Sequence, residues 1–175
     1  FIRSDIKLQS IKKRYSYMSF SSLALDKSLT DAIKALGYEN PTPIQQQAIP
    51  AVLAGKAIMA GAQTGTGKTA AFALPILQQL MKATDASRPI SALVLTPTRE
   101  LAQQVYKSFL NYAQNTQLNV AVAYGGVSIN NQIAALEKGA DILIATPGRL
   151  LDHLTKENVN LSQPQTCLLH LSPSP

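Results

Sequence analysis

The sequence contains no tryptophan and a single cysteine, Cys167, among its 175 residues. One cysteine cannot form a disulfide within the chain, so nothing points to an oxidising compartment, and we expect a cytoplasmic protein. A run of about 18 apolar residues is also missing, which argues against a membrane-spanning helix. Charged residues make up 15% of the chain and hydrophobic residues 46%. This balance and length are typical of one globular α/β domain with a sizeable core.

Acidic residues are few: ten Asp and Glu stand against sixteen Lys and Arg, and none lies after Glu157. The basic excess is concentrated in residues 1–17, where five basic residues and one acidic residue give a net charge of +4. We expect a solvated, disordered leader there. A basic arm that binds RNA or a membrane is the alternative, and the composition weakly resembles a transit peptide.

From Asp26 onward, helix-like and strand-like segments alternate. We expect helices over residues 26–36, 43–54, 68–82, 99–114, 129–137 and 148–156, and strands over 57–62, 91–96, 118–126 and 141–146, with 165–171 as a possible fifth strand. Thr42 is the expected N-cap of the second helix and Pro43 its first residue. Apolar strands between amphipathic helices predict an α/β fold with a parallel sheet flanked by helices.

Each of the first four strands is followed by an unusual cluster: AQTGTGKT at 62–69, TPTRE at 96–100, YGG at 124–126 and TPGR at 146–149. In parallel sheets, ligands bind at the carboxyl ends of the strands. Since these ends meet at one edge, we expect a continuous binding surface there.

The first cluster fits a P-loop, a glycine-rich turn that binds phosphate, although Ala62 stands where the strict pattern has glycine. Gly65 and Gly67 allow the backbone N–H groups to face a phosphate, and the following helix adds positive potential. Lys68 would reach the β- and γ-phosphates, and the Thr69 hydroxyl would bind Mg²⁺. The residues expected around the phosphates are Ala62, Gln63, Thr64, Gly65, Thr66, Gly67, Lys68 and Thr69.

A second pattern lies upstream. Alone, Gln45 is either the solvated start of an amphipathic helix or an amide able to read the edge of adenine. The combined pattern resembles the Q motif of DEAD-box RNA helicases, and it consists of Gly37, Tyr38, Pro41, Ile44 and Gln45. Phe20 stands 17 residues before Gly37, where that family has its adenine-stacking aromatic residue.

The other clusters are similar to further motifs of the same family, which also has an alanine at the position of Ala62. PTRELA at 97–102 resembles motif Ia, Gly125 and Gly126 resemble the GG element, and TPGR at 146–149 resembles motif Ib. The resemblance covers residues 18–161 and is closest to the bacterial branch. It implies a RecA-like P-loop NTPase fold and the N-terminal ATP-binding domain of an ATP-dependent RNA helicase.

The resemblance implies ATP and Mg²⁺ as cofactors and RNA as the partner of a monomeric protein. Phe20 and Gln45 would select adenine, and Tyr38 would pack near the base. Residues implied to hold the RNA backbone are Pro97, Thr98, Arg99, Gly125, Gly126, Thr146, Pro147, Gly148 and Arg149. Such contacts are independent of sequence and weaken with salt. The alternative for Arg99 and Arg149 is a helix residue paired with a neighbouring group.

Hydrolysis in the family requires an Asp-Glu-Ala-Asp sequence, a Ser-Ala-Thr motif and a second domain, none of which is found in these residues. We therefore expect a leader at 1–17, an incomplete domain at 18–161 and a tail at 162–175 unlike the family, as a changed reading frame would produce. The chain alone is expected to be inactive. One alternative is a non-catalytic nucleotide- and RNA-binding module, and another is a P-loop kinase or GTPase.

Overall fold

The computed structural model describes residues 19–58, 65, 67–82, 90–161 and 166–169, the last four by their backbone alone. Its helices are η1 (Phe20–Leu23, a 3₁₀ turn), α2 (Lys27–Ala35), α3 (Pro43–Leu53), α4 (Lys68–Met81), α5 (Arg99–Ala113), α6 (Ile129–Glu137) and α7 (Pro147–Thr155). Its strands are β1 (Ala92–Leu95), β2 (Val120–Ala123), β3 (Ile142–Ala145) and β4 (Thr166–Leu169). None of the helices among these residues is long and apolar enough to cross a membrane.

The six expected helices are confirmed, and each begins and ends within one residue of its predicted bounds. Three of the predicted strands are present in shortened form as β1, β2 and β3, and the possible fifth strand is β4. The strand expected over 57–62 lies mostly outside the described residues, and residues 57 and 58 have no regular structure. The turn η1 was not expected.

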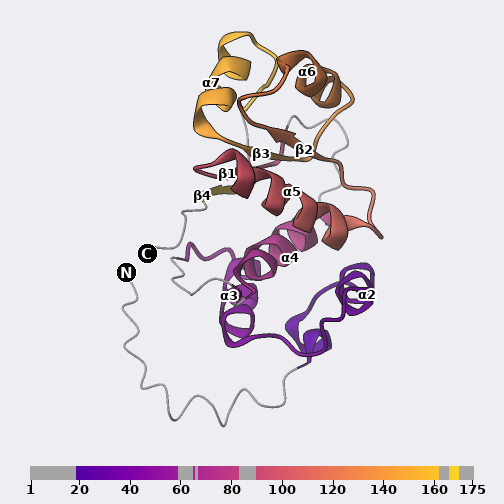
Figure 1. Ribbon diagram of the computed structural model, residues 1–175. Coiled ribbons are helices and arrows are strands. Elements are labelled where there is room, and N and C mark those ends of the chain that lie inside the picture. The colour runs from indigo at the N-terminus through magenta and orange to yellow at the C-terminus, as the bar shows by residue number, and fades with distance from the viewer. Residues whose placement is uncertain (1–18, 59–64, 66, 83–89, 162–165, 170–175) are drawn as a thin grey trace.

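The four strands form one parallel sheet in the order β2-β3-β1-β4. Leu95 pairs with Ala145, and Ala145 pairs with Ala123, so the carboxyl ends of β1, β2 and β3 are level with one another. Helices α6 and α7 lie on one face of the sheet and α4 and α5 on the other (Figure 1). Helix α3 packs against α4, and α2 packs against α5. The predicted α/β fold with both faces covered is confirmed.

The helix starts follow from capping chemistry. Thr42 and Gln45 form a capping box at the start of α3, with Pro43 as the first helical residue. The Asp26 carboxylate accepts a hydrogen bond from Ser28 N at 2.9 Å, and Thr98 Oγ1 accepts one from Leu101 N at 3.2 Å. Each cap satisfies a backbone N–H that the first helical turn leaves without a partner.

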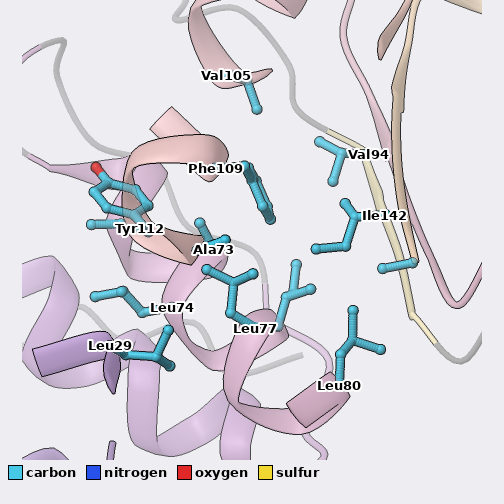
Figure 2. Packing of buried hydrophobic residues seen from close by; sticks show 14 of the residues in the cluster. Leu29, Ala73, Leu74, Leu77, Leu80, Val94, Val105, Phe109, Tyr112 and Ile142 are labelled. Carbon is cyan, nitrogen blue, oxygen red and sulfur yellow. The ribbon is translucent and has the colours of Figure 1, made fainter. Parts of the chain in front are cut away.

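Alternating strand residues divide the core between the two faces of the sheet. Val94 and Ile142 face α4 and α5, whereas Leu93 and Leu143 belong to the smaller cluster on the side of α6 and α7. Phe109 of α5 is fully buried, and Figure 2 shows it between α4 and the strand side chains. Burial on both faces holds the carboxyl edge of the strands on a rigid base.

Candidate functional site

The P-loop ends directly at the start of α4, where Gly67 is the N-cap and Lys68 and Thr69 are the first two helical residues. Gly67 has φ +80°, a left-handed conformation that side chains disfavour. A Cβ atom there would also lie only 2.3 Å from Gln45 Nε2. Glycine is thus required at this position for two separate reasons. Ala62, Gln63, Thr64 and Thr66 lie outside the described residues.

Lys68 and Thr69 are half-buried, and their side chains form no hydrogen bond or ion pair with another residue that the structure describes. Their position in the first turn of a 14-residue helix adds the backbone N–H groups and the positive end of the helix dipole. Ammonium, hydroxyl and helix N-terminus together suit a phosphate. The hydroxyl is also the kind of oxygen ligand that Mg²⁺ takes beside a phosphate.

Gln45 joins α3 to this loop. Its side chain is 0% exposed. Its Oε1 accepts a hydrogen bond from Thr42 N at 2.9 Å, and its Nε2 donates one to Gly67 O at 3.1 Å. Each end of the amide keeps capacity for one further hydrogen bond, but a base would reach it only after a change in its surroundings, because the side chain is fully covered. The sequence analysis did not foresee this second role, although Thr-x-x-Gln before an apolar helix is the signature of a capping box.

The two expected aromatic residues, Phe20 and Tyr38, form a chain of edge-on contacts with Tyr112, which was not expected. The Phe20 and Tyr38 ring centroids are 6.4 Å apart, and those of Tyr38 and Tyr112 are 6.2 Å apart. The hydroxyls of Tyr38 and Tyr112 lie 3.1 Å from each other. Phe20 is 5% exposed and packs in the larger hydrophobic cluster. Its stacking on adenine therefore stays a prediction, and it would require a change in its surroundings.

The three remaining clusters lie at one edge of the sheet, as expected. Thr96 N donates to Ala145 O, and Thr146 N donates to Ala123 O, both at 2.9 Å, so the segments that leave the strands are held side by side. This edge carries Pro97, Thr98, Arg99, Gly125, Gly126, Thr146, Pro147, Gly148 and Arg149. Thr98 and Thr146 are the N-caps of α5 and α7, which therefore both begin at this edge.

Arg99 and Gly126 are neighbours although 27 positions separate them in the chain. A Cβ at Gly126, where φ is +82°, would lie 3.0 Å from Arg99 Nη1. The Arg99 side chain is half exposed, and Nη2 pairs with Glu100 Oε1 at 3.2 Å. The pKa of the Glu100 carboxyl is lowered, first by a hydrogen bond from its own backbone N–H and then by Arg99. The pairing expected as the alternative role of Arg99 is thus present, and the guanidinium is still accessible.

Arg149 is turned toward the protein. Its side chain is 11% exposed, and its Nε lies 3.5 Å from Asp152 Oδ2. Nη1 and Nη2 both donate to Val127 O at 3.1 Å, and Nη1 also donates to Gln132 Oε1 at 3.1 Å. The predicted contact between Arg149 and an RNA phosphate would require some of these bonds to be exchanged, and it stays a prediction.

Gln132 was missed by the sequence analysis, which assigned no role to His153 either. Gln132 Nε2 donates to Tyr124 O at 2.9 Å, and its Oε1 lies 3.0 Å from His153 Nε2. Burial lowers the pKa of His153, and the nearby Arg149 charge lowers it further. A signal for Gln132 was available: it stands three residues after Ile129 and four before Leu136, on the apolar face of its helix.

Known proteins of similar sequence and structure support one assignment. The DEAD/DEAH box helicase family model matches residues 42–169, more than half of the chain. The match extends past residue 161, where the resemblance was expected to end, and it includes β4.

Among curated relatives, the DEAD-box ATP-dependent RNA helicase RhpA of Helicobacter pylori is 44% identical over 89% of this chain and 31% of its own length. The ATP-dependent RNA helicase CshA of Limosilactobacillus reuteri is 46% identical over 87% of this chain and 30% of its own length. The chain therefore spans about a third of these relatives. The crystal structure of a DEAD box protein from Methanococcus jannaschii superposes with a TM-score of 0.78 at 42% identity, covering 87% of this chain and 41% of that one. By family model, sequence and structure, the chain belongs to the DEAD/DEAH box helicase family.

Proposed function

We propose that the chain is the N-terminal ATP-binding domain of an ATP-dependent RNA helicase, a protein that couples ATP hydrolysis to RNA unwinding. The observation that carries this proposal is the hydrogen bond from Gln45 Nε2 to Gly67 O at 3.1 Å. In this bond the Gln45 side-chain amide lies beside the turn that leads to Lys68 and Thr69, and an amide is a group able to pair with the edge of adenine. The relatives named above, which are called ATP-dependent RNA helicases, support the same conclusion.

In this proposal, Lys68 and the N-terminus of α4 hold the nucleotide phosphates, and the Thr69 hydroxyl binds Mg²⁺. When bound, Mg²⁺ neutralises phosphate charge and orients the phosphates for transfer. Gln45 uses its remaining donor and acceptor on the adenine edge, and Phe20 lies close to the base. The other nucleotide-binding residues we propose are Ala62, Gln63, Thr64, Gly65, Thr66 and Gly67.

RNA would lie along the carboxyl edge of β1, β2 and β3. Thr98, Arg99, Gly126 and Thr146 offer hydroxyl, guanidinium and backbone N–H groups there, which contact phosphate without reading bases. We therefore propose sequence-independent binding, weak for this part of the protein alone. The remaining proposed contacts are Pro97, Gly125, Pro147 and Gly148, and Arg149 joins them only if it exchanges its bonds to Val127 O for a phosphate.

Nucleotide binding is tested with a fluorescent ATP analogue, with and without MgCl₂, in competition with ATP, ADP and GTP. We expect the adenine nucleotides to displace the probe and GTP to do so poorly. Lys68→Ala and Gln45→Ala should each weaken binding, whereas Gln114→Ala, an exposed change at the end of α5, serves as the control. Displacement by GTP as efficient as that by ATP would mean that the site does not select adenine and that Gln45 has another role.

Hydrolysis is measured separately as RNA-stimulated phosphate release. ATP hydrolysis requires a carboxylate that orients the attacking water, and in the family the Asp-Glu-Ala-Asp sequence supplies it. These 175 residues contain no such sequence, and none of their ten acidic residues follows Glu157. We therefore expect them to bind ATP without turnover. Turnover by these residues would contradict this reading and show that another group performs that role. The relatives named above do not favour the alternative of a non-catalytic binding module, which predicts the same binding without any activity in a longer protein.

A further inference from the structure

We propose that Gln132 is a positioning residue for the RNA-binding edge: through Arg149, its amide fixes the backbone after Gly126 to the start of α7. The inference rests on the proposed RNA binding at this edge. It assigns a role to a buried group that the proposed contacts do not use.

The contacts of Gln132 join three segments. Its side chain is 7% exposed, so its amide is satisfied by protein groups. Nε2 donates to Tyr124 O at 2.9 Å, at the end of β2. Oε1 accepts from Arg149 Nη1 at 3.1 Å and lies 3.0 Å from His153 Nε2, both on α7. One α6 residue thus links the end of β2 to α7.

The hydrogen-bond pattern determines which ring nitrogen of His153 carries the proton. The two lone pairs of Gln132 Oε1 accept from Arg149 and from His153 Nε2–H. His153 Nδ1 is then free to accept from Asn158 Nδ2, which lies 3.4 Å away. A neutral imidazole protonated at Nε2 satisfies both contacts, and its lowered pKa favours that neutral form. The amide oxygen is therefore fully used by these two partners, Arg149 and His153, and one N–H of the amide donates to Tyr124 O.

Arg149 carries this restraint to the RNA-binding edge. Its Nη1 and Nη2 both hold Val127 O, each at 3.1 Å. Arg99 is also near this backbone, because its Nη1 would lie 3.0 Å from a Cβ at Gly126. The Gly126–Val127 backbone thus lies close to two guanidinium groups, that of Arg99, which is half exposed, and that of Arg149, which is largely covered. Its position sets where the Gly126 N–H meets a phosphate.

Three variants of the full 175-residue chain test the proposal, and Arg149→Gln serves as the reference for a loop without its guanidinium. Gln132→Met keeps the side-chain length and removes both amide functions. Gln132→Glu keeps an acceptor for Arg149 and His153 but loses the bond to Tyr124 O. The matched control is Gln78→Met in α4, since Gln78 is also buried, at 5% exposure, and bonds to a backbone group, Asp26 N.

The measurements are amide hydrogen exchange of residues 125–128, the affinity for a fluorescein-labelled oligouridylate, and the affinity for a fluorescent ATP analogue. We expect Gln132→Met to speed exchange at 125–128 and to weaken RNA binding about three- to tenfold, the factor that corresponds to one intramolecular hydrogen bond. ATP affinity should not change. Gln132→Glu should recover most of both effects, and Gln78→Met should produce neither.

Unchanged exchange and RNA affinity in Gln132→Met would overturn the proposal. Equal effects in Gln78→Met would also overturn it, because they would reflect general destabilisation. If Gln132→Met does not fold, the comparison is made between Gln132→Glu and Arg149→Gln. Exchange at residues 125–128 that is equally fast in both variants would overturn the proposal, because the acceptor retained by Glu would then not position the loop. If the unaltered chain binds ATP but no RNA, the proposed RNA-binding function fails, while hydrogen exchange still decides whether Gln132 positions the loop.

Discussion

At the residue scale, a comparison of two glycines distinguishes the cost of a left-handed backbone from the cost of a steric clash. Gly67 and Gly139 both have positive φ, +80° and +89°, but a Cβ would meet Gln45 at the first and nothing within 4 Å at the second. A left-handed alanine costs about 1–2 kcal/mol. We expect Gly139→Ala to lose about that much stability and Gly67→Ala to lose more.

Urea denaturation of both variants measures the difference, and the fluorescent ATP analogue measures its effect on the site. Gly67→Ala should weaken nucleotide binding, because Gln45 must move away from the loop, whereas Gly139→Ala should bind normally. Equal stability losses with normal binding in both would show that the contact between Gln45 and Gly67 is not tight.

His153 gives a prediction about pH. Burial and Arg149 lower its pKa from the ordinary value of 6.5, so the folded state favours the neutral ring. The unfolded chain binds the proton more readily. The stabilising contribution is therefore complete above about pH 6.5 and is lost as the pH falls through the lowered folded value.

The free energy of unfolding, measured between about pH 5 and pH 8, should thus fall on the acid side. His153→Gln cannot take up the proton and should flatten this part of the curve relative to the unaltered protein. Identical curves for the two proteins would mean that folding does not lower the pKa of His153.

At the element scale, α5 connects the two parts of the site. It begins at Thr98 and Arg99 on the strand edge and ends near Tyr112, whose hydroxyl meets Tyr38 at 3.1 Å. Phe109, 0% exposed, holds the helix to the sheet (Figure 2). We expect Phe109→Ala to cost about 3–5 kcal/mol of unfolding free energy, as for other buried phenylalanines.

The adjacent Leu110 provides the control, because its side chain is 42% exposed and points away from that core. Leu110→Ala should change stability by less than about 0.5 kcal/mol. Chemical denaturation of the two variants makes the comparison. Similar losses would mean that α5 packs on the sheet in a different rotation from the one described.

The sequence predicted elements better than side-chain directions. Helix ends were accurate because local groups determine them, such as the Thr42 cap with Pro43 and the Thr98 cap. The shared edge followed from the parallel arrangement alone. The inward turn of Arg149 was not foreseen, since its partner Gln132 is 17 residues away and the contact depends on how α6 and α7 pack. The burial of Phe20 against Tyr38 could not be predicted for the same reason, because it depends on how segments far apart in the sequence pack together.

At the scale of the whole molecule, the formal charge of +6 and the accessible Arg99 predict salt-sensitive RNA binding. For single strands, the logarithm of affinity falls with that of salt by about 0.7 for each neutralised phosphate. We expect Arg99→Gln to reduce this slope. Arg149→Gln should weaken binding while leaving the slope unchanged, because its guanidinium faces Val127 O and not a phosphate.

A salt titration of oligouridylate binding by the unaltered chain and the two variants makes this test. A reduced slope for Arg149→Gln would show that Arg149 turns outward to meet RNA, as the family resemblance implies. An unchanged slope for Arg99→Gln would remove Arg99 from the RNA contacts.

The contact between Tyr38 and Tyr112 has an optical consequence. Since the sequence has no tryptophan, its near-ultraviolet absorption and emission come mainly from six tyrosines. Burial raises the pKa of Tyr112, and its hydrogen bond to Tyr38 raises it further. In an alkaline titration followed by phenolate absorbance, Tyr112 should ionise late, after the exposed phenols or only as the fold opens. The chain thus carries its own label-free probe at the junction between α5 and the segment that follows α2.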